Sequence, residues 1–132
     1  MSARLEHVNI TVSNPEATAE LYGRLFGWKQ RWKQRWKGGS IHNGTSIHVG
    51  TDAQYVALYS GRPDRKQAHR GDSYSETGGL NHLAVTVDDL NAVEVAVIAE
   101  GLEPHSHASY EPGRRFYFHD RDGIEYEVVS YD

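Results

Sequence analysis

The chain contains no cysteine, which excludes disulfide bonds, thiolate metal ligands and thiol catalysis. It also lacks any apolar run that approaches the length of a membrane span, and no signal-peptide-like run precedes the strand-like segment that begins at residue 5. The formal net charge is only -4 at pH 7, which argues against nucleic acid as the main partner. We therefore predict a cytoplasmic protein with neither a membrane nor a nucleic-acid partner.

The chain does contain enough residues and apolar side chains for one domain with a real core. Its 132 residues are 38% hydrophobic and 24% charged, and aromatic and β-branched side chains are too common for a disordered chain. Eight histidines are many for this length. This supply of imidazoles, together with the absence of cysteine, directs attention to metal sites made of nitrogen and oxygen ligands.

Two halves of the chain repeat one pattern. Residues 5–12 and 80–87 are similar alternating segments, and each precedes a helix-like apolar stripe and then three strand-like runs. We predict an α+β fold of two tandem βαβββ modules that form a curved mixed sheet around a cleft, all within a single domain, 1–132. The predicted parts are module one, 1–60, a linker, 61–79, and module two, 80–132. The three strands that follow the helix are predicted at 28–37, 44–50 and 54–60 in module one, and at 103–108, 114–119 and 124–130 in module two.

Three residues in these strands form a candidate metal site. His7 and His82 occupy the same place in the two copied strands, and Glu127 lies in the last strand. Two imidazoles and one carboxylate around a common cavity bind a divalent metal and leave coordination positions open for a substrate. The alternative for Glu127 is a salt bridge to an arginine such as Arg114 or Arg115, because a buried carboxylate is costly unless it is paired.

Other histidines and acidic residues are weaker candidates. His105 and His107, two residues apart, could share a strand face and bind a second metal, but ordinary pocket or surface positions are the favoured interpretation. The segment Asp120-Arg121-Asp122-Gly123 has some features of a calcium loop, but its length favours a tight turn.

The segment 28–37 repeats a four-residue unit of tryptophan, lysine, glutamine and arginine. As a strand it would place its tryptophans and glutamines on one face and its lysines and arginines on the other. A basic, aromatic surface of this kind can bind nucleic acid, but the rest of the chain is acidic. A duplicated, over-long hairpin with a solvated basic face is the favoured interpretation.

The paired segments "EHVNITV" and "NHLAVTV" and the closing segment Phe116–Glu127 resemble the vicinal oxygen chelate superfamily. That superfamily includes glyoxalase I, extradiol dioxygenases, fosfomycin-resistance transferases and bleomycin-resistance proteins. The resemblance implies one divalent ion, Fe, Mn, Zn or Ni, held by His7, His82 and Glu127. The corresponding place in module one is Ala57, which cannot bind a metal and therefore disfavours the four-ligand site of glyoxalase I.

The same resemblance implies the roles of other residues. Tyr117, ten residues before Glu127, matches a tyrosine that faces the substrate, and Asn9 and Thr11 would orient the substrate. The predicted function is a lyase, isomerase, transferase or ring-cleaving dioxygenase that acts on a small substrate chelated through vicinal oxygens, with dioxygen admitted if the metal is Fe(II). The alternative is a non-enzymatic protein that binds a small molecule or drug. A homodimer is expected, with the metal site inside one chain or shared between two.

Overall fold

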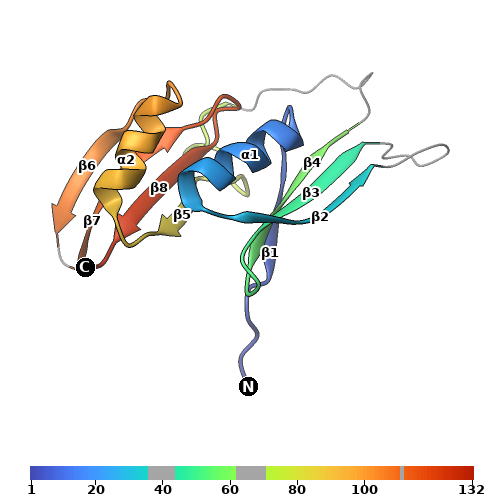
Figure 1. Ribbon diagram of the computed structural model, residues 1–132, viewed down its shortest axis with the longest axis horizontal. Coiled ribbons are helices and arrows are strands. Elements are labelled where there is room, and N and C mark those ends of the chain that lie inside the picture. The colour runs from blue at the N-terminus through green and yellow to red at the C-terminus, as the bar shows by residue number, and fades with distance from the viewer. Residues whose placement is uncertain (36–43, 62–70, 111) are drawn as a thin grey trace. The chain divides into compact units, whose positions relative to one another are not determined.

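The computed structural model describes residues 1–35, 44–61, 71–110 and 112–132. The chain divides into two compact units, Met1–Gln67 and Ala68–Asp132, and each unit contains one helix and one four-stranded sheet (Figure 1). Among the helices of these described segments, none is both long enough and apolar enough to cross a membrane.

In the first unit the strand order is β1-β4-β3-β2. β1 runs parallel to β4, whereas β4 with β3 and β3 with β2 pair in antiparallel fashion. The sheet is therefore mixed. Its elements are β1 His7–Thr11, α1 Pro15–Phe26, β2 Lys29–Arg35, β3 Thr45–Gly50 and β4 Tyr55–Ser60.

The second unit repeats this arrangement with the order β5-β8-β7-β6, in which β5 runs parallel to β8. Two tandem βαβββ modules with mixed sheets confirm the predicted α+β fold. The elements of the second unit are β5 Leu83–Thr86, α2 Leu90–Ala99, β6 His105–Tyr110, β7 Gly113–His119 and β8 Glu125–Ser130.

Both helices begin at a side chain that caps them. The Asn14 Oδ1 accepts a hydrogen bond from the Ala17 backbone N–H at 3.2 Å, and Asp89 Oδ1 accepts one from the backbone N–H of Ala92 at 3.0 Å. These bonds satisfy amide groups that have no partner inside the helix. Gly27, with φ 71°, ends α1 in the left-handed conformation that glycine adopts without steric cost.

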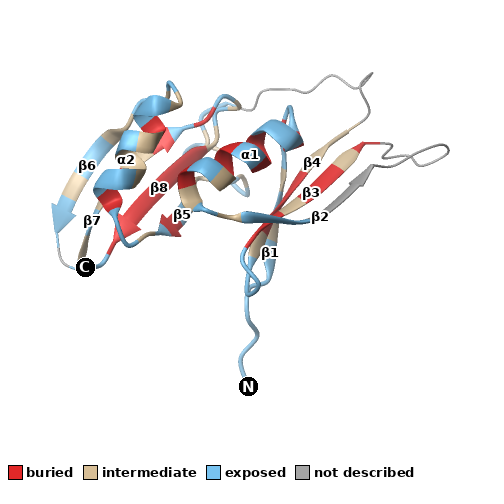
Figure 2. Cartoon of the chain, viewed as in Figure 1, coloured by how far each residue is buried: buried red, intermediate tan, exposed pale blue. Residues whose placement is uncertain are grey.

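Each helix covers one face of its own sheet, and the two cores are apolar. Buried residues follow one side of α1 and α2 and all of β8 (Figure 2). Burying one leucine or phenylalanine side chain contributes about 1.5–3 kcal/mol. The largest core side chains are Tyr22, Ile47, Val49 and Leu58 in the first unit, and Val97, Phe116, Phe118, Tyr126 and Val128 in the second.

Both long edge strands carry an irregularity. In β2 the register with β3 shifts between Gln30 and Trp32, so the backbone pairing of this strand is not regular. Trp36 and the end of this repeated segment lie outside the described residues. In β6 the register shifts between His105 and Ala108.

The segment Asp120–Gly123 is a tight turn, as predicted. Its first carboxylate organises it: Asp120 Oδ1 accepts hydrogen bonds from the backbone N–H groups of Asp122 at 2.9 Å and Ile124 at 3.0 Å. The other oxygen, Oδ2, accepts a hydrogen bond from the Tyr126 hydroxyl at 2.7 Å. This turn aligns β7 with β8 and so sets the register of the strand that carries Glu127.

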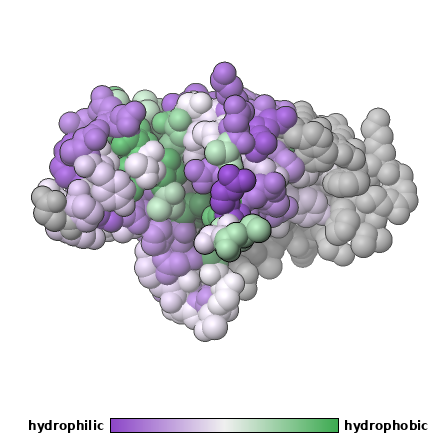
Figure 3. All heavy atoms as spheres, turned by 90° about the horizontal axis from the view of Figure 1, so that it is seen from below, coloured by the Kyte–Doolittle hydropathy of each residue, from purple (hydrophilic) through white to green (hydrophobic). Residues whose placement is uncertain are grey.

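The exposed surface is mainly polar. Hydrophilic side chains predominate over the described part of the face seen in Figure 3, in agreement with the mean hydropathy of -0.67. Among the larger apolar side chains, Val95 and Ile98 of α2 are 67% and 57% exposed.

Replacing Tyr126 by Phe tests the turn. Burial raises the pKa of Asp120, whereas the Tyr126 hydroxyl lowers it by bonding the ionised form. We expect Tyr126→Phe to reduce the free energy of unfolding by about 2 kcal/mol at pH 7, because a hydrogen bond to a buried charge is lost. The measurement is urea denaturation followed by circular dichroism.

The effect of this substitution depends on pH in a defined direction. The folded pKa of Asp120 is raised, so protonation of this carboxyl stabilises the fold below the unfolded pKa, and that contribution is lost as pH rises through the folded pKa. The Tyr126 hydroxyl acts in the opposite direction, because it bonds the ionised carboxylate and lowers the pKa. The Tyr126→Phe loss should therefore be largest at neutral pH and shrink in acid, where Asp120 is neutral. Tyr131→Phe, at an exposed tyrosine, is the control. A loss equal at both pH values would contradict this account.

Candidate functional site

One face of the second sheet carries Tyr117 and Glu127 together with His119 and Glu125. Cross-strand partners lie on the same face of a sheet, and residues two apart in a strand share that face. Tyr117 pairs with Glu127 and His119 pairs with Glu125 between β7 and β8, while Ala84 of β5 pairs with Glu127 from the other side. The opposite face carries the phenylalanines that pack in the core. The second unit therefore has one apolar face and one face of charged, imidazole and phenol groups.

Glu127 lies at the centre of this polar face, and its carboxylate has several partners. Glu127 Oε1 lies 3.1 Å from His82 Nε2, and Oε2 accepts a hydrogen bond from Arg115 Nη1 at 2.8 Å. The residue is only 8% exposed. Because a buried carboxylate is costly without such partners, these two contacts account for its place in the strand. The salt bridge to Arg115 is one of the two alternatives left open for Glu127 by the sequence.

The Tyr117 hydroxyl also reaches this carboxylate. Burial raises the pKa of the Tyr117 phenol, and the charge of Glu127 and a hydrogen bond to it raise the pKa further. Tyr117 therefore stays protonated at neutral pH. Its ring contacts the edge of the His82 ring at a centroid distance of 5.7 Å.

His82 lies immediately before β5 and is held from both sides. Its Nδ1 is 2.6 Å from the Asn81 side-chain oxygen, Oδ1. A neutral His82 that donates its Nδ1 proton to Asn81 has its lone pair on Nε2 and can bind a metal there. The contact with Glu127 in the metal-free protein instead requires a proton on Nε2, because a carboxylate only accepts hydrogen bonds. An imidazole nitrogen and a carboxylate oxygen about 3 Å apart match two neighbouring ligands of one metal ion, since each would lie about 2.0–2.2 Å from it.

His7 stands in the first unit with a similar local arrangement. Its Nδ1 is 2.8 Å from Glu6 Oε1, so the residue before each of the two repeated histidines offers an oxygen to Nδ1. The His7 bond lowers the pKa of Glu6, which is exposed. The His7 ring stacks on Tyr55 at 4.8 Å, and His48 stacks on the same tyrosine at 4.6 Å. Burial, followed by the charge of His7, lowers the pKa of His48.

The strand registers show which residues are equivalent in the two modules. Asn9, two residues after His7, pairs with Ala57, and Ala84, two residues after His82, pairs with Glu127. Ala57 therefore occupies the place of Glu127 in the first module, as the sequence indicated. Asn9 and Thr11 lie on β1 in alternation with His7, and both side chains are exposed.

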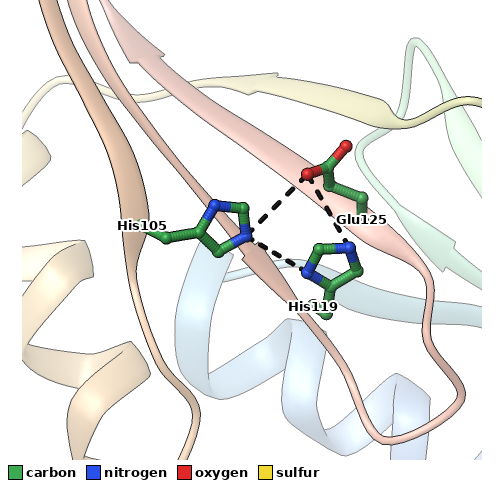
Figure 4. Close-up of side chains that lie close together, drawn as sticks. All are labelled: His105, His119 and Glu125. Carbon is green, nitrogen blue, oxygen red and sulfur yellow. Dashed lines mark hydrogen bonds and ion pairs between the residues drawn. The ribbon is translucent and has the colours of Figure 1, made fainter. Parts of the chain in front are cut away.

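Sequence reasoning missed a second cluster on the polar face. His105, His119 and Glu125 come together from β6, β7 and β8 (Figure 4). The hydroxyl of Tyr74, in the segment interpreted as a linker, donates a hydrogen bond to Glu125 Oε1, which raises the pKa of Tyr74 to about 12. The sequence offered one signal for this cluster: Glu125 and Glu127 are two residues apart in the last strand, so their side chains share a face.

His105 and His107, which were considered as a pair, have separate surroundings. His107 Nε2 lies 2.9 Å from Glu94 Oε2 of α2, and the His107 ring stacks on Phe116. His105 Nε2 instead lies 3.1 Å from His119 Nδ1. A register shift in β6 lies between His105 and Ala108, and the two histidines have different partners, so the structure does not bring them together in one site.

The sequence matches the Glyoxalase/Bleomycin resistance protein/Dioxygenase superfamily over residues 4–128, and the chain belongs to this superfamily. No protein of curated description matches the sequence significantly.

Three solved structures illustrate the shared fold. A glyoxylase/bleomycin resistance protein/dioxygenase domain from Frankia sp. EAN1pec is 18% identical, with a TM-score of 0.78 over 100% of this chain and 94% of that one. A glyoxalase family protein from Enterococcus faecalis is 21% identical, with a TM-score of 0.69 over 97% and 96%. The fosfomycin resistance protein FosX from Listeria monocytogenes, solved with Mn(II) and sulfate, is 16% identical, with a TM-score of 0.69 over 98% and 93%.

Replacing Arg115 by Met tests the pairing of Glu127. We expect a lower thermal midpoint, by more than about 5 °C, in metal-free protein, because a buried carboxylate loses its cationic partner. Differential scanning calorimetry measures the shift.

Arg114→Met is the matched control, since Arg114 is the preceding residue on the same strand and is exposed. If both substitutions lower the midpoint equally, the pairing with Glu127 does not stabilise the fold.

Proposed function

We propose that the protein is a divalent-metal-dependent enzyme whose metal ion binds a small substrate through two neighbouring oxygen atoms. The observation that carries this proposal is the approach of His82 Nε2 to Glu127 Oε1 at 3.1 Å, at the two ligand positions that belong to the second module. His7, in the equivalent position of the first module, is the third proposed ligand.

The donor atoms suit a divalent ion. Imidazole nitrogen and carboxylate oxygen are ligands for Mn, Fe, Ni and Zn, and three protein ligands leave positions open for a substrate. Glu6 and Asn81 orient His7 and His82 by bonding Nδ1, in the manner of residues that support metal ligands. The FosX structure with Mn(II) supports a divalent metal in a protein of this fold. The metal of this chain is one of these four elements.

A bound ion would act as a Lewis acid toward the substrate oxygens. The residues of the chain supply the remaining functions. Arg115 binds Glu127 Oε2 and so leaves Oε1 facing His82. Tyr117, protonated at neutral pH, donates a hydrogen bond to an oxygen on which negative charge develops, which is the general way in which such donors lower a barrier. Asn9 and Thr11 offer an amide and a hydroxyl to orient the substrate.

The alanine at position 57 narrows the reaction class. A glutamate or glutamine there would add a fourth protein ligand and leave fewer open positions. With three ligands the site favours chemistry in which the substrate takes two positions, as in ring-cleaving dioxygenases and fosfomycin-resistance transferases. Lyase and isomerase reactions that use the same chelation remain within the proposal.

A second function, non-enzymatic binding of a small molecule, is favoured by the pairing of Glu127 with Arg115. Without a metal, this carboxylate already has a cationic partner at 2.8 Å and a phenol beside it. The clustered tyrosine and histidine rings would then provide the binding surface. A protein that fails to bind Mn²⁺, Fe²⁺, Ni²⁺ or Zn²⁺ at the His82–Glu127 pair would support this second function.

His82→Ala tests the metal site directly. We expect the affinity for Zn²⁺ or Mn²⁺ at this site to fall at least about 100-fold, since losing a ligand should cost no less than losing a supporting residue. Isothermal titration of chelator-treated protein, with elemental analysis of the dialysed product, provides the measurement. His107→Ala is the matched control, because His107 is an exposed histidine on another strand. Unchanged binding in His82→Ala would rule out the assignment.

We also propose that the protein is a homodimer. Mixing two variants that each lack one metal ligand distinguishes a site within one chain from a site shared between the two chains. His7→Ala and His82→Ala each lack one ligand. If the ligands come from two chains, a mixed dimer regains one complete site, and metal binding recovers to about one ion per mixed dimer. If all three ligands come from one chain, mixing restores nothing. Light scattering during size-exclusion chromatography gives the oligomeric state, and a strictly monomeric protein would exclude the shared site.

A further inference from the structure

We propose that His105, His119 and Glu125 form a second divalent-cation site in the second unit, separate from His82 and Glu127. The ligands are two imidazoles and one carboxylate, which favour a Zn²⁺-like ion. The three residues belong to β6, β7 and β8, so an ion bound here would link three neighbouring strands. This proposal does not depend on the proposed enzymatic function.

Three contacts connect the side chains of this cluster. His105 Nε2 lies 3.1 Å from His119 Nδ1, whereas His105 Nε2 and His119 Nε2 lie 3.8 and 3.7 Å from Glu125 Oε2, which is longer than a hydrogen bond (Figure 4). One ligand atom from each residue can be chosen so that all three lie within 4.8 Å of one another. Bonds of about 2.0–2.2 Å to one tetrahedral ion place ligand atoms roughly 3.3–3.6 Å apart, so the contacts at 3.8 and 3.7 Å need only a small closure. The His119 side chain, 49% exposed, has room to move.

Glu125 is a buried carboxylate with one oxygen in a hydrogen bond and the other in two longer ion-pair contacts. The residue is 6% exposed, and Tyr74 donates a hydrogen bond to its Oε1. Its Oε2 faces the two imidazoles without a hydrogen bond to either. A cation between them would compensate the charge, while Tyr74 would keep Oε1 oriented, as supporting residues do around metal ligands.

The local backbone of β6 aims His105 at this cluster. Ser106 has φ 56°, a left-handed conformation that is uncommon for a residue other than glycine, and it lies in the bulge between His105 and Ala108. The Ser106 hydroxyl lies 2.9 Å from His105 Nδ1, which leaves Nε2 directed at His119 and Glu125. Bulges of this kind re-aim a side chain and are common beside functional sites.

A four-coordinate ion held by these three side chains would have one further position, which water or an anionic group of a ligand could take. The His105 ring stacks on the Tyr117 ring at 6.3 Å, and Tyr117 contacts His82 on its other side. An ion in the second site would therefore lie one aromatic side chain away from the His82–Glu127 pair.

The test uses the 132-residue chain with the His82–Glu127 site removed by substitution. After chelator treatment, His82→Ala protein is titrated with Zn²⁺ by calorimetry and with Co²⁺ by its visible absorption. We expect one ion per chain. Adding His119→Ala should lower the affinity at least about 100-fold, and adding His105→Ala or Glu125→Gln should do the same. Adding His107→Ala, on the same strand as His105 but paired with Glu94, should leave binding unchanged.

The outcomes separate this proposal from the proposed function. If His82→Ala protein binds no ion while the unmodified protein binds one, the second site does not exist and the first one stands. If binding survives His82→Ala and is lost with His119→Ala, the second site stands by itself. Should the double variants fail to fold, histidine side-chain NMR of the unmodified protein replaces them. Zn²⁺ should then shift the His105 and His119 signals, and an absence of shifts would overturn the proposal.

Discussion

The charge of Glu127, buried in the middle of a strand, is the constraint around which the second unit is organised. A carboxylate that is 8% exposed requires partners, and the neighbouring strands supply them: Arg115 of β7 on one oxygen and His82, just before β5, on the other. The opposite face of this sheet carries the buried side chains of Phe116, Phe118, Tyr126 and Val128. One sheet therefore separates a hydrophobic core from a face on which ionisable groups meet at hydrogen-bond distance.

The two modules share a backbone plan and differ in chemistry. Equivalent registers place Ala57 in the first sheet where Glu127 stands in the second. The first module consequently keeps a histidine, His7, stacked on Tyr55, but has no carboxylate at its own equivalent position. The repeat accounts for the paired histidines, and the alanine at position 57 leaves the first sheet without a carboxylate at the place of Glu127.

Tyr117 gives the polar face of the second sheet a further property. It pairs with Glu127 across β7 and β8, and its ring touches both His82 and His105. The two groups of candidate ligands therefore have a common neighbour. Any ligand that displaces the Tyr117 side chain would alter the surroundings of both, because packed side chains transmit displacement to their contacts.

Particular residues show how far the sequence could be interpreted. The copied strands and the turn at Asp120 are local patterns, and each was predicted from a few neighbouring residues. The register shifts in β2 and β6 were not predicted, since a bulge depends on the register between two strands.

The sequence by itself therefore determined the tandem βαβββ plan, the equivalence of His7 with His82, and the absence of a ligand at Ala57. Only the tertiary structure decided that Arg115 pairs with Glu127 and that Tyr74, His105, His119 and Glu125 meet. The physical reason is the sequence separation over which each interaction acts. Alternation and capping act over a few residues of chain, whereas these contacts join side chains from different strands and from the 71–79 segment.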